Sequence, residues 1–380
     1  MRIGIIGGGP AGLFAALLAR ERIGAEVELH ERDSEGVSYG FGVEIAGRGL
    51  DSIAAAHPLF SAAFRAAARP SADRLFVHRG EAVLIDGGHG LAIARADLLR
   101  LLAGLCREAG VRLHFDSPVT ADALQHCDLV IGADGVNSVV RDALAAFGTT
   151  RRMLTNRLAW YGTARLFDRP SIFFKAVGEG AWFWAVGYAY SNSRSTFVVE
   201  CNARSWARSG LDRLAPEDRR LLAERLFRDE LQGHALIENR SRWGVLPVIR
   251  NAAWHVGRTV LIGDALHSAH PTIGSGTRIA MEDAIALVDA LASCESLDSA
   301  LARFRVVREP AKTKLVHAAD CSIAWYETLA PRLEAFDAPT LAIDYLLRTG
   351  RLDEARLWRD HPLFMARHAD DWQRFIARQT

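Results

Sequence analysis

A glycine-rich turn near the N-terminus has the spacing of a phosphate-binding loop, in the string IIGGGPAGLF. Gly7 would permit a tight turn, Gly9 would let the backbone approach a pyrophosphate, and Gly12 would let a helix pack closely on the preceding strand. Pro10 and Ala11 begin the expected helix, whose free N–H groups and positive dipole end would face the same phosphates. The spacing G-x-G-x-x-G between a strand and a helix predicts a dinucleotide site. A glycine turn that serves only helix packing is the alternative.

A carboxylate follows this turn at the distance expected of such a site. The apolar run from Arg2 to Ile6 predicts a buried parallel strand, and a second strand is expected from Glu26 to His30, directly before Glu31. A carboxylate at that place accepts hydrogen bonds from a ribose hydroxyl. Glu31 favours FAD or NAD over NADP, because a 2′-phosphate needs a basic residue there. The adjacent Arg32 weakens that preference slightly.

Two further clusters of glycines and polar residues follow strand-like runs. In HCDLVIGADGVNSVVRDAL, the run from His126 to Ala133 ends at Asp134 and Gly135, and Arg141 lies on the helix expected next. In GRTVLIGDALHSAHPTIGSGTRIAMEDA, a short apolar strand ends at Asp264, and two histidines, a proline and two glycines follow. Taken alone, Asp134 and Gly135 could be an ordinary turn, and Arg141 an ordinary surface charge.

In this order, the three segments resemble the motifs of the single-component FAD-dependent aromatic hydroxylases. The third segment matches the family's string G-D-A-x-H-x-x-x-P-x-x-G-x-G at every fixed position, which are Gly263, Asp264, Ala265, His267, Pro271, Gly274 and Gly276. The resemblance implies FAD as the cofactor. No His or Cys stands where it would argue for a covalent link, so we expect FAD to be bound non-covalently.

The resemblance implies roles for residues around the flavin ring. Asp264 would accept hydrogen bonds from the ribityl chain, and Pro271 would form a rigid, apolar wall beside the isoalloxazine. Gly274, Gly276 and Thr277 would bring backbone N–H groups to the pyrimidine edge of the ring. The helix that begins there would point its positive end at the ring and stabilise the anionic reduced flavin.

Further implied roles lie on the phosphate side and beside the ring. Arg95 opens the helix-like string RADLLRLLAGLC and matches the position where relatives place an arginine on the FAD phosphates. A surface arginine at a helix start is the alternative. The Asp134 segment would lie near FAD and near the route of the nicotinamide cofactor. His267 and His270 are expected to act through packing or indirect hydrogen bonding rather than catalysis.

The similarity extends to a narrower branch of the family and spans nearly the whole chain. It is carried by the strings YGFGVEI, LAWYGTARLFD, STFVVEC, IGSGTRIAMEDAIAL and LLRTGRLDEARLWRDHPLF. These strings are similar to the salicylyl-CoA 5-hydroxylases, the monooxygenase half of 2-aminobenzoyl-CoA monooxygenase/reductase, and the indole-ring hydroxylase of violacein synthesis.

One strand departs from the pattern of that branch. Relatives read W-F-x-A-H-A-Y-[RK]-[FY], whereas WFWAVGYAY places Trp184, Val186 and Ala189 at the variable, histidine and basic positions. If this strand lines the substrate cavity, the pocket is more apolar than in relatives, and no specific substrate is carried over. No residue is assigned as catalytic; the candidates for the cavity near the ring are Tyr161, Trp184, His270 and Pro271.

The function that the resemblance implies is a monooxygenase that uses NADH or NADPH, FAD and O2. A flavin hydroperoxide would hydroxylate a small, electron-rich aromatic or indole-type substrate, and the protein would orient that substrate and exclude water. One alternative is hydroxylation or epoxidation of an aromatic acyl-CoA or carrier-bound thioester. Another is a flavin-dependent oxidoreductase that inserts no oxygen. A nucleotide-binding protein without chemistry would lack the Asp264 motif.

Composition excludes other classes of function. Lys and Arg total 46 against 45 Asp and Glu, so nothing favours nucleic acid or an acidic membrane surface as a partner. The five cysteines are scattered without a C-x-x-C pair, which favours a reduced, cytoplasmic setting and predicts neither disulfides nor a metal site. No run of about 18 apolar residues occurs, so no membrane span is expected.

The motifs and their order predict an α/β fold. A Rossmann-like FAD-binding domain would carry an inserted mixed β-sheet domain for substrate, with helices at the C-terminus. The 380 residues are enough for both domains. Aromatic and β-branched runs at Trp160 to Phe174, Trp182 to Tyr190 and Ser195 to Cys201 predict strands of the inserted sheet. The expected FAD-binding domain is discontinuous, covering 1–70, 90–155 and 244–310; the sheet domain covers 71–89 and 157–243, and the helical segment 311–380.

Overall fold

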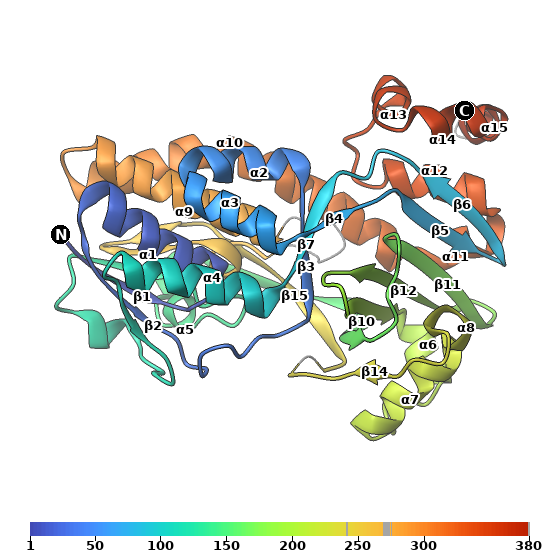
Figure 1. Cartoon of the computed structure of the whole chain (residues 1–380), viewed down its shortest axis with the longest axis horizontal. Helices are drawn as coiled ribbons and strands as arrows, with labels where there is room; N and C mark the ends of the chain where they lie inside the picture. Colours follow the sequence, from blue (N-terminus) through green and yellow to red (C-terminus); the bar gives the residue numbers. More distant parts are fainter. Residues whose placement is uncertain (241, 269–273, 275, 379–380) are drawn as a thin grey trace.

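Two sheets form the framework of the computed structural model, which describes residues 1–240, 242–268, 274 and 276–378 (Figure 1). A mostly parallel sheet of six strands occupies the half that contains the N-terminus. A larger mixed sheet of eight strands occupies the other half, together with the C-terminal helices. This arrangement is the α/β fold with an inserted sheet that the sequence predicts.

The six-stranded sheet has the strand order β16-β17-β9-β1-β2-β8. All neighbouring strands run parallel except β16, which pairs with β17 in the antiparallel sense. The central strands β1, β9 and β17 are short and mostly apolar, as expected where a parallel sheet is covered on both faces. Their bounds are β1 (Arg2–Ile6), β2 (Glu26–His30), β8 (Arg112–His114), β9 (Leu129–Gly132), β16 (His255–Val256) and β17 (Thr259–Leu261).

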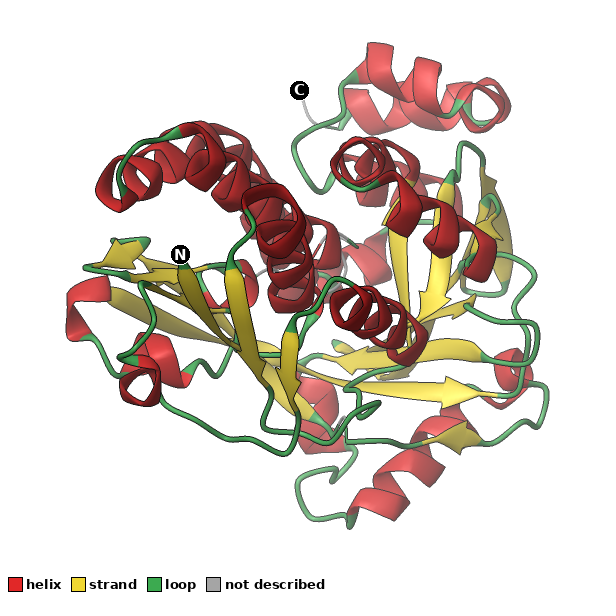
Figure 2. Ribbon diagram, turned by 60° about the vertical axis from the view of Figure 1, so that its left-hand side comes forward, coloured by secondary structure: helices red, strands yellow, loops and turns green. Residues whose placement is uncertain are grey.

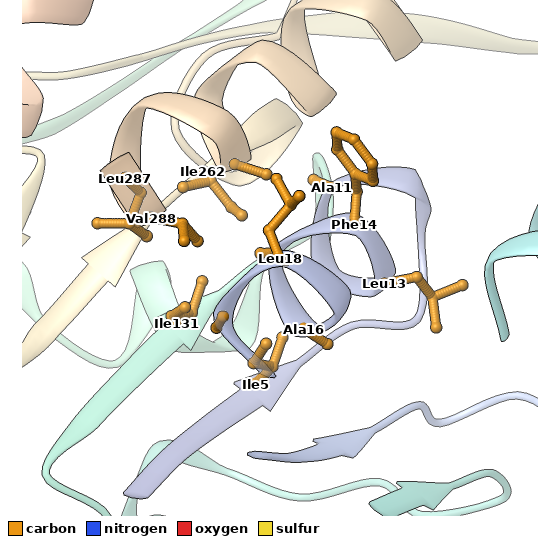
Figure 3. Packing of buried hydrophobic residues seen from close by; sticks show 14 of the residues in the cluster. Ile5, Ala11, Leu13, Phe14, Ala16, Leu18, Ile131, Ile262, Leu287 and Val288 are labelled. Atoms are coloured by element: carbon orange, nitrogen blue, oxygen red, sulfur yellow. The ribbon is translucent and has the colours of Figure 1, made fainter. Parts of the chain in front are cut away.

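Helix α1 (Pro10–Ile23) is buried along most of its length because other helices flank it. It packs against α4 (Arg95–Glu108) and α9 (Gly276–Ser293), and α9 in turn packs against α10 (Leu297–Glu327). Figure 3 shows side chains of α1 and α9 gathered over Ile5 and Ile131 of the sheet. This apolar packing fixes the glycine turn before α1 relative to the start of α9. Helices α2 (Gly47–Ala56) and α3 (Pro58–Ala67) cover the remaining edge of this half.

The eight-stranded sheet has the order β14-β10-β13-β12-β11-β5-β6, and β15 also pairs with β10. Strand β10 (Thr149–Thr163) is long enough to pair with β15 near its start and with β13 near its end. The other strands are β5 (Arg74–His78), β6 (Glu81–Ile85), β11 (Ser171–Gly178), β12 (Ala181–Ala189), β13 (Ser195–Cys201), β14 (Leu236–Ile237) and β15 (Gly244–Asn251).

Different helices cover the two faces of this sheet (Figure 2). Phe183 and Phe197 pack on one face against α6 (Ala203–Arg208), α7 (Pro216–Leu226) and α8 (Arg228–Leu231). Trp182 and Trp184 pack on the other face against the end of α10 and the helices that follow it. Those helices are α11 (Ala330–Ala335), α12 (Ala338–Leu347), α13 (Glu354–Asp360), α14 (Pro362–Arg367) and α15 (Ala369–Ala377).

A small antiparallel sheet lies between the two halves. Its order is β3-β7-β4, with bounds Gly42–Ala46, Gly90–Ala94 and Arg69–Ser71. Strand β7 runs directly into α4, so this sheet sets the position of Arg95 at the first residue of that helix. A short helix α5 (Val139–Asp142) follows β9 on the other side of the nucleotide-binding half.

Several predicted boundaries differ from the observed ones. The run Trp160 to Phe174 is the end of β10 and the start of β11, separated by a loop that ends at Pro170, where proline cannot donate to a strand ladder. The helical segment expected from residue 311 begins at Leu297, because α10 continues through Pro310. The division into domains at the predicted residues stays a prediction. None of the described helices has the length and apolar character needed to cross a bilayer.

Candidate active site

The glycine turn between β1 and α1 has a backbone that other residues would not tolerate. Gly7 has φ of +112°, and a Cβ there would lie 2.4 Å from the carbonyl oxygen of Ala133. A Cβ on Gly12 would lie 2.0 Å from the carbonyl oxygen of Gly7. A Cβ on Gly9 would meet no atom within 4 Å. Gly7 and Gly12 are therefore required for packing, whereas Gly9 keeps open the space that a ligand can enter.

Glu31 joins the end of β2 to the glycine turn. One of its carboxylate oxygens accepts a hydrogen bond from the Gly8 amide at 2.6 Å, and the other accepts one from the Asp33 amide at 2.9 Å. Each oxygen retains a lone pair, so the carboxylate can still accept from a ribose hydroxyl. The neighbouring Arg32 also lines the cavity and lies 3.9 Å from Asp33.

A cavity of about 670 Å³ connects these residues with the second half of the molecule. It runs along the glycine turn, past the ends of β2 and β9, and reaches the eight-stranded sheet. The predicted cofactor residues that line it are Gly7, Gly9, Pro10, Ala11, Glu31, Arg32, Arg95, Asp134 and Asp264. Gly12 lies behind it, in contact with the turn. Side chains far apart in sequence thus converge on one elongated space.

Asp134 and Arg141 hold the loop after β9. One oxygen of Asp134 accepts from the amides of Val139 and Val140 at 2.7 and 3.3 Å. The other oxygen is buried and has no hydrogen-bond partner within the described part of the chain, and burial raises the pKa of this carboxyl. Arg141 is itself buried, and its guanidinium donates to the carbonyl oxygens of Val136 and Ala265 at 3.0 and 3.4 Å. Arg141 therefore ties two loops of the site together, which excludes its being a surface charge.

The loop that carries Asp264 is fixed from behind by a buried ionic cluster. Gly263 has φ of +61°, and its amide donates to Asp283 at 3.0 Å. The same carboxylate accepts from Lys312 at 2.5 Å and from Arg308 at 2.8 Å. This network sets the turn that directs Asp264 toward the cavity. Sequence analysis did not single out Asp283, although it lies in the quoted string that ends at MEDA.

Asp264 and Arg95 influence each other electrostatically although they belong to distant segments. Burial raises the pKa of Asp264, and the positive charges of Arg95 and Lys312 oppose that rise. Burial lowers the pKa of the Arg95 guanidinium, and Asp264 opposes that change. Both residues line the cavity, so a carboxyl group and a cation are both available there.

The structure describes only some of the remaining residues of the motif that contains Asp264. Gly274 is exposed with φ of +61°, and Gly276 and Thr277 begin α9. His267 packs edge-on against Trp254, with ring centroids 5.5 Å apart, and burial lowers its pKa to about 3, so the ring is neutral. His270 and Pro271 lie outside the described residues.

The structure places the other two cavity candidates away from this space. Tyr161 lies on the face of β10 that packs against the α6–α8 side, together with Phe197. Its neighbour Trp160 lies on the opposite face and does line the cavity, as does Leu158. Side chains alternate along a strand, so Tyr161 points away from the cavity that Trp160 lines. Trp184 is on the cavity side of the sheet but is buried under α10, with its ring 5.9 Å from that of Tyr326.

The same alternation corrects the expectation for β12. Val186 lies on the face shared with Trp184, whereas Ala189 lies on the other face. The absent basic side chain at 189 therefore does not make the cavity face more apolar. Residues that the sequence did not indicate, Arg240 and Arg242, line the cavity near the sheet. Arg240 pairs with Asp33 across it.

The site fits the phosphates and sugars of FAD: an open glycine turn at a helix N-terminus, a ribose-binding carboxylate, a cation and a second carboxylate line one elongated cavity. This combination defines a flavoprotein with a second domain closing over one end of its cofactor site. Comparison with known proteins agrees. Residues 106–319 match the family described as an FAD binding domain.

Relatives extend that match across the chain. Salicyloyl-CoA 5-hydroxylase of a Streptomyces species is 38% identical over 362 residues, covering 92% of this chain and 70% of that protein. The 3-hydroxy-4-methyl-anthranilyl-[aryl-carrier protein] 5-monooxygenase of Streptosporangium sibiricum is 36% identical, covering 95% and 96%. Protodeoxyviolaceinate monooxygenase of Chromobacterium violaceum is 33% identical, covering 89% and 92%. The chain belongs to the family of FAD-dependent aromatic monooxygenases.

A solved structure shows the same fold at lower sequence similarity. A crystal structure of 2-methyl-3-hydroxypyridine-5-carboxylic acid oxygenase superposes with a TM-score of 0.70 at 20% identity, covering 94% of this chain and 96% of that one. At that identity the likeness concerns the fold alone. It shows that the fold of nearly the whole chain also occurs in a solved protein.

Proposed function

We propose that this monooxygenase takes electrons from NADH or NADPH and hydroxylates an electron-rich aromatic or indole-type ring. The observation that carries the proposal is the course of the cavity, which begins at the dinucleotide turn and ends against Leu158 and Trp160 of the second sheet. FAD bound along it supplies the redox chemistry that activates O2. An aromatic wall at the far end suits a flat substrate ring.

The residues of the chain bind and orient rather than react. The Gly9 turn and Arg95 would hold the phosphates, Glu31 the ribose, and Asp264 the ribityl hydroxyls. The buried cluster at Asp283 keeps the Asp264 loop in place. Bound FAD and substrate would displace water from the cavity, and this exclusion limits the wasteful release of hydrogen peroxide.

A thioester-linked aromatic acid is the second candidate substrate. Two of the relatives act on CoA-bound or carrier-bound substrates by their names. Arg240 and Arg242 border the cavity, where they could contact the phosphates of such a carrier group. Free indoles and aromatic thioesters are therefore the two classes to be separated.

The test compares oxygen transfer on a panel of compounds. Flavin-loaded enzyme is given NADH or NADPH with indolic compounds, aromatic CoA thioesters and free benzoates that carry an OH or NH2 group. Labelled O2 incorporated into product, with little hydrogen peroxide released per NAD(P)H oxidised, identifies the substrate class. NAD(P)H oxidation that never yields labelled product with any aromatic compound would contradict oxygen insertion.

A further inference from the structure

The six-stranded sheet carries a cluster of metal-ligating side chains beside the flavin cavity. Glu28 and His30 lie on β2, His114 lies on β8, and His126 and Cys127 lie shortly before β9. They share the face of the sheet opposite α1. Gly4, which pairs with Glu28, would direct a Cβ to within 3.1 Å of the Cys127 sulfur. The predicted absence of a metal site rested on cysteine spacing, which cannot detect ligands from separate strands.

The ligand atoms form two groups that share Glu28. In the first, His126 Nε2 lies 2.5 Å from the Glu28 carboxylate and the Cys127 sulfur lies 3.4 Å from it. In the second, Glu28 joins His30 and His114, whose rings stack with centroids 4.6 Å apart. Within each group all ligand atoms lie within 4.8 Å of one another. Such separations can be spanned by one ion with bonds of about 2.0–2.3 Å after small side-chain movements.

His30 adds an independent observation. Its Nδ1 contacts the Ser117 hydroxyl at 2.9 Å. Its Nε2 is buried and has no hydrogen-bond partner among the described residues. A hydrogen bond at one ring nitrogen that fixes the tautomer and leaves the other nitrogen with a lone pair is the usual state of a histidine ligand. A simple hydrogen-bonded cluster would leave this nitrogen unexplained.

We propose that Glu28, His126 and Cys127, together with the adjacent His30 and His114, form a binding site for a divalent transition metal, with Zn²⁺ as the ion that best suits the ligands. Carboxylate, imidazole and thiolate are all zinc ligands, and this mixture disfavours Mg²⁺ and Ca²⁺, which prefer oxygen. Cys127 is buried while His126 is half exposed, so an ion can enter from the surface and bind a protected sulfur.

The site is adjacent to the flavin cavity through one strand. His30 lines that cavity, and its carbonyl oxygen accepts a hydrogen bond from the Gly7 amide at 2.8 Å. Glu31 follows directly in sequence. An ion bound to β2 would therefore act on the end of the strand that supports the phosphate turn, and metal and FAD affinities would be linked reciprocally.

Zinc binding to the flavin-loaded protein tests the proposal. After chelator treatment and dialysis, we expect about one high-affinity Zn²⁺ per chain by calorimetry and elemental analysis. The double variant His126→Ala/Cys127→Ser should bind at least tenfold more weakly and lose the zinc-dependent rise in melting temperature. The matched control is His317→Ala/Cys321→Ser, a second His–Cys pair 3.7 Å apart on α10, which should bind zinc as the wild type does. Equal loss in both variants, or none in the first, overturns the proposal.

A spectroscopic measurement separates ligation from misfolding. Co²⁺ in a tetrahedral site with nitrogen and sulfur ligands absorbs in the red, where oxidised flavin does not. Wild-type protein loaded with Co²⁺ should show this absorption, and the single variant Cys127→Ser, with FAD content and circular dichroism unchanged, should shift or lose it. Identical cobalt spectra for the wild type and Cys127→Ser would exclude this sulfur as a ligand and overturn the site as proposed.

Discussion

Asp283 and Glu200 are both buried carboxyl groups, one in each half of the molecule, and they are in opposite states. Burial would raise the pKa of Asp283, but Lys312 and Arg308 hold it below its usual value, so the group is an anion. Glu200 on β13 accepts a hydrogen bond from the Asn156 side chain at 3.1 Å, and burial raises its pKa to about 8. Glu200 is therefore mostly protonated at neutral pH.

The different ionisation states of Asp283 and Glu200 follow from the part of the structure that each carboxyl group supports. Asp283 anchors the Gly263 amide, and with it the loop that must present Asp264 at a fixed place in the cofactor cavity. A buried anion with two cations is costly to assemble but restricts that loop to one arrangement. Glu200 lies in a sheet face packed with Trp184 and Tyr326, where a neutral acid costs less than a charge. The buried charge of Asp283 therefore fixes a loop, whereas the neutral Glu200 preserves an apolar face of the second sheet.

The largest expected effect comes from removing the charge of Asp283. Asp283→Asn leaves the buried Lys312 without its ion-pair partner, while Arg308 keeps only its pair with Glu282, so the free energy of unfolding should fall by about 3–5 kcal/mol. Urea denaturation of the flavin-free protein measures this. Asp289→Asn on the same helix is the control, because its side chain is 56% exposed and its ion pair with Arg22 lies at the surface. Similar losses in the two variants would contradict the anchoring role.

The second prediction concerns the pH dependence of Glu200. Because its pKa is raised from 4.5 to about 8 in the folded protein, its contribution is largest below pH 4.5 and is lost as the pH rises through 8. Glu200→Gln removes this dependence, so the stability of the wild type relative to the variant should fall by roughly 3–5 kcal/mol between pH 4.5 and 8.5. Denaturation curves across that range, with Glu81→Gln as an exposed control, should show the trend for Glu200 alone. A constant difference would mean that Glu200 is ionised throughout.

The third prediction tests what the anchored loop presents to the cofactor. Asp264→Ala removes a charge-assisted acceptor for flavin hydroxyls and should weaken FAD binding by about 1.5–3 kcal/mol. His267→Ala should have a smaller effect, because the neutral ring packs against Trp254. Fluorescence titration of flavin-free protein gives both affinities. Acid precipitation should release all the flavin, since the site is expected to hold it non-covalently. Unchanged FAD affinity in Asp264→Ala would remove the basis for assigning this loop.

The smallest effects should distinguish the two faces of the second sheet. Tyr161→Phe alters the face that packs on the α6–α8 side, so the fraction of NAD(P)H consumption coupled to product should change by less than about twofold. Trp160→Leu alters the cavity wall and should increase peroxide release per NAD(P)H. The two variants are compared by measuring hydroxylated product and hydrogen peroxide in the same reaction with the preferred substrate. A larger effect from Tyr161→Phe than from Trp160→Leu would reverse the assignment of the faces.

Local sequence was sufficient for the nucleotide-binding half. The bounds of β1 and β2, the start of α4 at Arg95 and the turn at Gly7 follow from apolar runs and glycines adjacent in sequence. The second half was harder because strand alternation alone does not say which face is covered by which helices. Tyr161 and Trp160 are adjacent aromatic residues that the sequence pattern does not distinguish, yet their side chains lie on opposite faces of the sheet. Asp283, Arg240 and the ligands around Glu28 depend on contacts between distant segments, which one sequence without relatives does not reveal.

The order of strands in the six-stranded sheet also has a consequence for folding. Strand β17 is paired with β9, yet six of the eight strands of the second sheet, β10 to β15, lie between them in the chain. During synthesis, the glycine turn and β9 emerge long before β17, α9 and the Lys312 side chain that completes the ionic cluster. Bringing β9 and β17 together closes a long segment of chain, which is slow. The exposed edge of β9 can pair incorrectly until β17 has been synthesised. The cofactor site is thus one of the last parts of the molecule to form, and FAD can stabilise only a chain that is nearly complete.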